Sequence, residues 1–153
     1  MPMTLDSPAF VQEAAIPQRY SLDGENLSPP VRWHGAPATA RSYVLVVEDP
    51  DAPSGTFGHW GIFNIPATQH DLPEGAGSRE SNGRRIVTND FGHRRYDGPR
   101  PPAGHGMHHY HFRLAALDVP TLEVPANSTV ETLWNSAKAH IVAQAELVGT
   151  YER

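Results

Sequence analysis

The sequence contains no cysteine among its 153 residues. Disulfide bridges, thiolate zinc sites and cysteine nucleophiles are therefore excluded, and nothing indicates an oxidising compartment. A chain of this length can bury a core without such cross-links. We expect a single domain over residues 1–153, held together by side-chain packing.

Long apolar runs and basic clusters are missing too. No segment approaches the ~20 apolar residues that cross a bilayer, and the first residues lack the basic and apolar parts of a secretory signal. The formal net charge is -5 at pH 7, and no Lys/Arg cluster extends beyond "GRR" and "HRR". Nucleic acid and anionic membranes are thus disfavoured as partners. We expect a soluble, cytoplasmic protein with no transmembrane segment.

Proline, in contrast, is abundant and dispersed: 15 residues predict rigid turns between short strands.

Residues 41–49 and 58–66 are apolar on both alternating faces, which is typical of central strands. Residues 108–118 alternate instead. One face of this segment carries Tyr110, Phe112, Leu114 and Ala116, and the other carries His109, His111 and Arg113.

The last third of the chain predicts one helix and one strand. Ser128 followed by Glu131 forms a capping-box pattern before apolar residues at helical spacing, which predicts a helix over about 129–140. Residues 141–151 alternate and favour a C-terminal strand. The fold class is therefore mostly β, with antiparallel strands in two layers and a helix on the flank.

The segment "DPDAP" follows the first predicted central strand. Residues before proline are extended and proline fixes its own φ, so this segment is a stiff bracket. Asp49 continues the face of Leu45 and Val47 and should point inward. Asp51 points roughly the same way if the bracket stays extended. A simpler alternative is that both carboxylates only bond their own backbone in an Asx turn.

Four quoted segments together resemble one family. They are "IPQRYSLDGENLSPPVRWHGAP", "VVEDPDAPSGTFGHWGIFNIPA", "NDFGHRRYDGPRPPAGHGMHHYHFRLAALD" and "AKAHIVAQAELVGTYER". Over nearly the whole chain they look like the bacterial branch of the phosphatidylethanolamine-binding proteins, also called Raf kinase inhibitor-like proteins. The resemblance implies a large central antiparallel sheet, a smaller second sheet and peripheral helices. It also implies a small anion-accepting pocket at one end of the central sheet.

The resemblance further implies the residues of that pocket. Its ligand-binding set falls on Asp49, Asp51, Pro53, His59, Gly98, Pro101, Pro102, His108 and Tyr110. It implies a homodimer and a cis peptide between Ala52 and Pro53. It implies no catalytic residue, no resident metal and no cofactor. His109 stands where the family often has arginine, but it lies on the face opposite Tyr110, so we expect the pocket to survive this change.

Two carboxylates beside an anion site would repel the anion unless they serve other groups. We therefore predict that Asp49, with Asp51 nearby, accepts a hydrogen bond from His59, fixes its ring and raises its pKa. His59, His108 and Tyr110 would then form a cradle for phosphate, carboxylate or a phospholipid headgroup, with an aspartate as counter-ion for an ammonium group.

Three other functions stay open at this point. His109 and His111 lie two apart on one strand face and could chelate zinc or copper with an aspartate. The acids and bases of the pocket could instead catalyse proton transfer on a small substrate. The family also includes kinase and protease inhibitors, for which the rim around Arg100 and Pro101 could dock a protein partner. We favour a binding protein over an enzyme.

Overall fold

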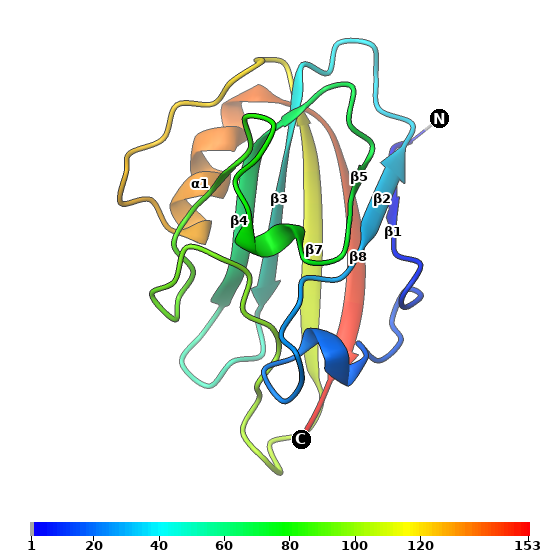
Figure 1. The fold of residues 1–153 in the computed structure, drawn as a ribbon, viewed down its shortest axis with the longest axis vertical. Coiled ribbons are helices and arrows are strands. Elements are labelled where there is room, and N and C mark those ends of the chain that lie inside the picture. The colour runs from blue at the N-terminus through cyan, green and yellow to red at the C-terminus, as the bar shows by residue number, and fades with distance from the viewer. Residues whose placement is uncertain (1) are drawn as a thin grey trace.

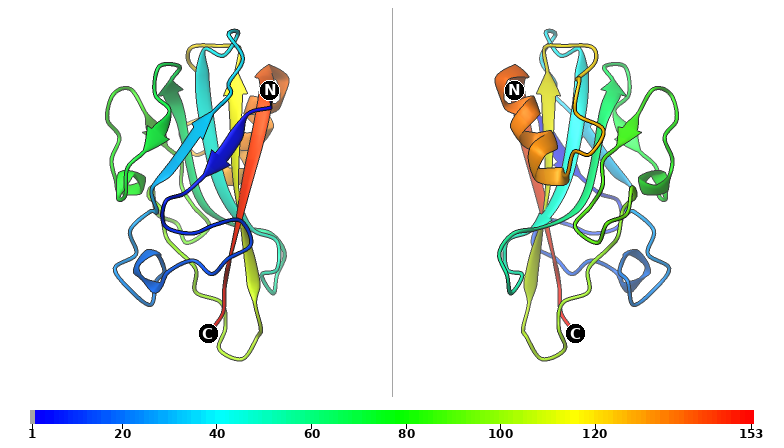
Figure 2. Two further views of the ribbon diagram at one scale, coloured as in Figure 1. Left: turned by 90° about the vertical axis from the view of Figure 1, so that its right-hand side faces the viewer. Right: turned by 90° about the vertical axis from the view of Figure 1, so that its left-hand side faces the viewer.

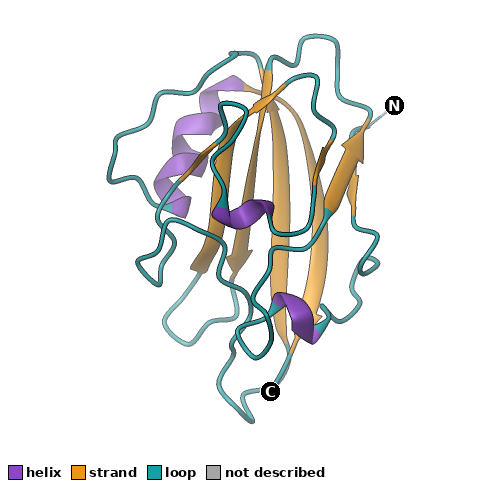
Figure 3. Ribbon diagram, in the orientation of Figure 1, coloured by secondary structure: helices purple, strands orange, loops and turns teal. Residues whose placement is uncertain are grey.

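The computed structural model describes residues 2–153, which form two antiparallel sheets (Figures 1 and 3). The large sheet has the order β6 (Arg85–Ile86), β4 (Phe57–Pro66), β3 (Ser42–Asp49), β7 (His108–Leu117) and β8 (Ile141–Tyr151). The small sheet has the order β1 (Thr4–Asp6), β2 (Val31–His34) and β5 (Asp71–Leu72). The predicted fold class, with a large central sheet and a smaller second one, is confirmed.

Helices are few and short. The α-helix α1 (Val130–Ala137) runs directly into the 3-10 helix η3 (Lys138–His140), so the predicted helical range is confirmed. Two further 3-10 turns are η1 (Gln18–Tyr20) and η2 (Ala76–Ser78). Within the described residues, none of these helices has the length and apolar character needed to cross a membrane.

The large sheet is covered on both faces. Leu45 and Val47 of β3 pack into one apolar cluster with Trp33 of the small sheet. Val44 and Val46, on the opposite face, pack into a second cluster with residues of α1. Figure 2 shows the small sheet and α1 on opposite sides of the large sheet. Burial on both faces is the reason that β3 is apolar at every position from Tyr43 to Val47.

The alternation predicted for β7 is confirmed. Its apolar set is buried against the small-sheet side, whereas His109, His111 and Arg113 are only partly buried on the other face. Arg113 reaches from this face to Glu48, with Nη1 2.9 Å from Oε1. Its guanidinium also lies 4.2 Å from the ring centroid of Trp134, so it links the sheet to α1.

The helix cap predicted at Ser128 and Glu131 is wrong by one residue. Thr129 is the N-cap: its hydroxyl accepts from the N–H of Thr132 at 3.3 Å, and the Thr132 hydroxyl accepts from the N–H of Thr129 at 2.7 Å. The sequence offers overlapping hydroxyl residues here, and capping alone does not choose between them. The structure uses the Thr129–Thr132 pair, and Leu133 packs into the apolar cluster on the large sheet.

The lower end of the large sheet in Figure 1 holds the C-terminal end of β3 and the N-terminal end of β7. Because β3 is antiparallel to both β4 and β7, its C-terminal end lies beside their N-terminal ends. Asp49, Phe57 and His108 are the strand-end residues there. Loops 50–56 and 87–107 extend from this end of the sheet.

Candidate functional site

A cavity of about 250 Å³ lies at this end of the sheet. Seven of the nine predicted site residues line it, namely Asp49, Pro53, His59, Pro101, Pro102, His108 and Tyr110. Five residues outside the predicted set complete the lining: Ala52, Ser54, Phe57, Phe91 and Arg100. Residues far apart in the sequence thus share one concave surface, as the resemblance implied.

Asp51 and Gly98 do not line this cavity. Asp51 is exposed, and its Oδ2 lies 2.8 Å from both the backbone nitrogen and Nδ1 of His109. Slight burial opposes ionisation of Asp51, but the hydrogen bonds from His109 outweigh it and lower the pKa of Asp51. Gly98 packs against Tyr20, where a Cβ would lie 2.0 Å from the carbonyl oxygen, so Gly98 positions the loop rather than facing the cavity.

Asp49 is buried, with 3% of its surface exposed, and both of its oxygens are bonded. Oδ2 lies 2.6 Å from Nδ1 of His108, and Oδ1 accepts from the backbone N–H of Asp51 at 2.8 Å. The prediction that Asp49 orients His59 is wrong: it orients His108. The simpler Asx-turn interpretation holds for one oxygen only.

His59 is held by a backbone carbonyl instead. Its Nδ1 lies 2.7 Å from the carbonyl oxygen of Asp97, and because a carbonyl only accepts, Nδ1 carries the proton. Burial lowers the pKa of His59 and outweighs the Asp97 hydrogen bond and the charge of Asp49, which raise it. The predicted rise in pKa is therefore wrong. The ring is neutral at pH 7, and Nε2 is an acceptor with no hydrogen bond among residues 2–153.

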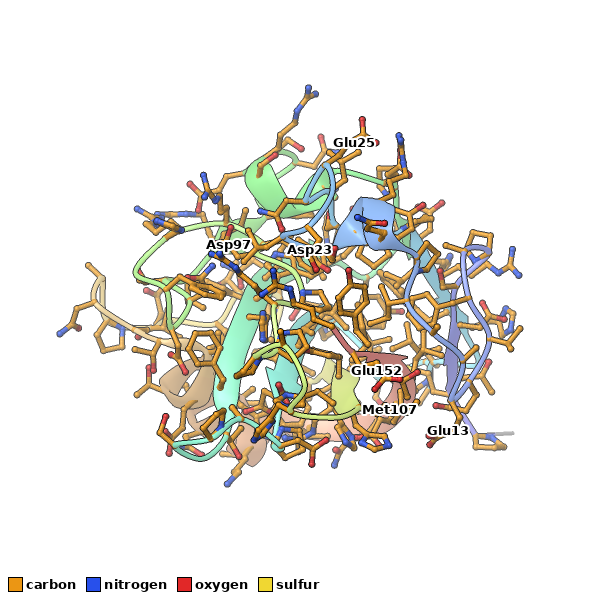
Figure 4. The ribbon with its side chains drawn as sticks, turned by 90° about the horizontal axis from the view of Figure 1, so that it is seen from below. Glu13, Asp23, Glu25, Asp97, Met107 and Glu152 are labelled. Atoms are coloured by element: carbon orange, nitrogen blue, oxygen red, sulfur yellow. The ribbon has the colours of Figure 1, made fainter. Side chains whose placement is uncertain are left out.

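Asp97 anchors the loop that holds His59. Its side chain is 1% exposed and bonds four side chains. Oδ1 accepts from Asn26 at 2.9 Å and Arg95 at 3.0 Å, and Oδ2 accepts from Asn89 at 2.9 Å and pairs with His93 at 2.7 Å. Burial raises the pKa of Asp97, but these partners outweigh it and lower the pKa. Figure 4 shows Asp97 at this end of the molecule. No sequence signal predicted that Asp97 is buried and binds these side chains.

Aromatic rings form one wall of the cavity. The centroid of the His59 ring lies 5.0 Å from that of Phe57, 5.6 Å from Phe91 and 5.3 Å from Tyr110. Burial, with the Asp49 charge adding, raises the pKa of Tyr110, so its hydroxyl stays protonated. Phe57 and Phe91 thus give the cavity apolar surface beside the polar atoms of His59 and Tyr110.

The Ala52–Pro53 peptide is trans, as are all peptide bonds among the described residues, so the predicted cis bond is wrong. The Gly55 N–H donates to the Ala52 carbonyl at 3.1 Å. Pro53 is therefore the second residue of a four-residue turn, where a trans proline fits and fixes the required φ; a cis proline belongs at the third position.

The histidines of the proposed metal site have other partners. Nδ1 of His109 lies 2.8 Å from Asp51, and Nδ1 of His111 lies 3.2 Å from Glu146. Within residues 2–153 no group of three or more His, Cys, Asp or Glu side chains could hold a metal ion. The arrangement does not support the metal alternative.

The family model of the phosphatidylethanolamine-binding proteins matches residues 6–152. The chain belongs to this family. It is 41% identical to a UPF0098 protein of Methanothermobacter thermautotrophicus over 153 residues, covering 99% of both chains. It is also 38% identical over 151 residues to LppC of Mycobacterium tuberculosis, named as a candidate lipoprotein, covering 99% of this chain and 73% of that protein. The crystal structure of Escherichia coli YbcL, described as a member of the mammalian family, matches with a TM-score of 0.94 and 31% identity, covering 100% of this chain and 99% of YbcL.

Proposed function

We propose that the chain binds a small phosphorylated ligand, of the size of a phospholipid headgroup, in the cavity at the end of the large sheet. One observation carries the proposal: the Asp49–His108 pair, neutral His59, Tyr110 and Arg100 all line the same cavity. Its volume of about 250 Å³ lies just below the range of roughly 300–1,000 Å³ typical of drug-sized ligands. A headgroup-sized molecule matches that volume.

The charges around the cavity favour an anion despite the aspartates. Both oxygens of Asp49 already accept hydrogen bonds, and Asp51 lies outside the cavity with His109. Arg100 lines the cavity and makes no ion pair with any residue from 2 to 153. Its guanidinium can therefore meet a phosphate with two parallel hydrogen bonds.

The hydrogen-bonding groups favour a ligand that both donates and accepts. Nε2 of neutral His59 is an acceptor, and the protonated Tyr110 hydroxyl is a donor. A monoprotonated phosphate satisfies both groups, and phosphoethanolamine adds an ammonium donor and a short carbon chain. The carbon chain can lie against the aromatic rings of Phe57 and Phe91.

The expected affinity is modest. A hydrogen bond to a charged group contributes about 1.5–3 kcal/mol, and association itself costs free energy. A few such bonds give a Kd on the order of micromolar to millimolar for a small anion. Tighter binding requires further contacts with a tail of the ligand.

The test is titration calorimetry with phosphoethanolamine on the wild type and on His59→Asn. Asparagine places an amide N–H near the position of Nδ1, so it keeps the bond to Asp97 and removes the Nε2 acceptor together with part of the aromatic wall. We expect affinity to fall roughly 10-fold or more. His140→Asn is the matched control, since His140 is partly exposed and pairs with Asp118 away from the cavity. Equal affinity in all three proteins would refute the proposal.

A second candidate is acid–base catalysis in the same cavity. The buried Asp49–His108 pair favours it, because a carboxylate on one imidazole nitrogen is a common way to prepare the ring for proton transfer. Turnover in a phosphatase, esterase or lyase panel that is lost in both Asp49→Asn and His59→Asn would favour this candidate over simple binding.

Further properties rest on the family or on the sequence alone. A homodimer and a cytoplasmic location stay predictions, as does modulation of a protein partner through the rim of Arg100 and Pro101. The partial exposure of Phe91 beside the cavity, 39%, is compatible with a docking role for this rim. Light scattering on the purified protein measures the oligomeric state, and a pulldown unaffected by Arg100→Ala would argue against docking there.

A further inference from the structure

Both ring nitrogens of His108 are occupied. Nδ1 lies 2.6 Å from Oδ2 of Asp49, and Nε2 lies 2.6 Å from Nδ1 of His105. Each imidazole nitrogen makes one hydrogen bond, either as a donor or as an acceptor. Although His108 lines the cavity, it offers no unoccupied nitrogen to a ligand while His105 is in place.

The two partners of His108 differ in how firmly they are held. Asp49 is buried at the end of β3, whereas His105 is exposed. His105 lies between Gly104 and Gly106, whose φ angles are +76° and +94°, and its backbone N–H donates to Pro102 at 3.1 Å. Glycine passes readily between backbone conformations, so this loop can move His105 at low cost.

The tip of the loop is exposed, and the Gly104 N–H ties it to the C-terminal segment by donating to the Arg153 carbonyl at 3.0 Å. Met107, on the side of the loop that leads into β7, is 53% exposed. His105 itself does not line the cavity. Its side chain can therefore leave His108 without opening a void in the packed interior, and the contact between the rings is the main interaction that its imidazole would lose.

We infer that His105 is a displaceable partner of His108, and that a bound anion takes its place on Nε2. This inference rests on the proposed function, because it requires an anion in the cavity. Nε2 then accepts from a phosphate hydroxyl or, when His108 is protonated, donates to a phosphate oxygen, with Asp49 still on Nδ1. His105 is a positioning residue that competes with the ligand and thereby weakens its binding.

The experiment is calorimetry with inorganic phosphate on the wild type, His105→Ala and His105→Asn. Removal of the competing imidazole should tighten phosphate binding roughly 2- to 10-fold in His105→Ala, the equivalent of one ordinary hydrogen bond. Asparagine places a polar atom near the position of Nδ1 and should keep the affinity closer to that of the wild type. His140→Ala is the control for removal of a remote, partly exposed histidine and should leave the affinity unchanged.

Ring ¹⁵N chemical shifts give a second readout that a merely structural role would not produce. In the protein without phosphate, His105→Ala should shift Nε2 of His108 and leave Nδ1 nearly unchanged. Phosphate added to the wild type should shift Nε2 of His108 and Nδ1 of His105 together, because one contact replaces the other.

The possible failures are distinguishable. If phosphate binds and His59→Asn weakens it, but His105→Ala changes neither the affinity nor the Nε2 shift, the role of His105 is refuted and the proposed function stands. If phosphate and phosphoethanolamine bind none of the proteins, the proposed function fails and this inference fails with it. Weaker binding in His105→Ala would show that His105 assists the ligand, which also overturns the inference.

Discussion

The Nδ1–H group of His59 donates a hydrogen bond to the carbonyl oxygen of Asp97, with 2.7 Å between nitrogen and oxygen. This contact determines which nitrogen of His59 faces the cavity. The Asp97 N–H returns a bond to the His59 carbonyl at 3.2 Å, so the two residues are paired through their backbones as well. A neutral, oriented imidazole at this position differs from the charged donor that the sequence suggested.

Stability should depend on pH through His59. Burial lowers its folded-state pKa below the ordinary value of 6.5, so the unfolded chain takes up a proton more readily than the folded one. The stabilisation from neutral His59 is present above about pH 6.5 and is lost as the pH falls, with a slope of up to about 1.4 kcal/mol per pH unit. Urea unfolding between about pH 7.5 and pH 5 should show a steeper loss in the wild type than in His59→Asn. Parallel curves for the two proteins would contradict this account.

Asp97→Ala should destabilise the fold by about 3 kcal/mol, because it leaves the buried amide of Asn89 and the partners Asn26, Arg95 and His93 without their acceptor. The free energy of unfolding in urea measures this loss. Asp118→Ala is the matched control: this carboxylate is half exposed and pairs only with His140 on the surface, so its removal should cost less than about 0.5 kcal/mol.

Gly98→Ala should be more damaging than Gly104→Ala, although both glycines are in the same loop region. A Cβ at Gly98 would lie 2.0 Å from the backbone oxygen of Tyr20, which cannot move aside easily, so we expect a loss of about 3 kcal/mol or more. A Cβ at Gly104 would meet no other side chain or backbone atom within 4 Å. Only the positive φ of +76° opposes alanine there, at a cost of about 1 kcal/mol. Thermal unfolding of the two variants gives the comparison, and equal shifts in Tm would contradict it.

Asp49 and His108 should be coupled. Asp49→Asn removes the charge and leaves one carbonyl oxygen for two donors, the N–H of Asp51 and Nδ1 of His108, so we expect a loss of about 1–3 kcal/mol. A double-mutant cycle with His108→Gln isolates the pair and should give a coupling of about 1 kcal/mol or more. Additive effects of the two substitutions would mean that the hydrogen bond between Asp49 and His108 contributes no net stability.

Much of the fold could be predicted because its signals are local or repeat along the chain. The alternation in β7 depends on one period and one buried face, and the two apolar strands each show burial on both sides. The pairing of imidazoles with acceptors could not be predicted. Asp49 lies near His59 in sequence, but the register of β3 with β7 brings His108 to its carboxylate, while a loop residue, Asp97, supplies the carbonyl for His59.

The missed cavity residues have a similar explanation. Phe57 begins a strand, and Phe91 and Arg100 lie in loops rich in turn residues, so none of them shows a periodic pattern. Their side chains meet only because the loops after β3 and β6 fold over the same strand ends. A sequence pattern reports which face of an element is buried, but not which loop covers its end.

The site draws its four central side chains from positions 49, 59, 108 and 110, on three different strands, and its anchor from position 97 in a loop. No short piece of the chain contains the whole constellation. During refolding the cavity can therefore form only after the distant strands have paired, a slow class of event that takes milliseconds to seconds in β proteins. Ligand-binding competence should consequently be among the last properties that a refolding molecule regains, well after collapse has hidden its tryptophans from water.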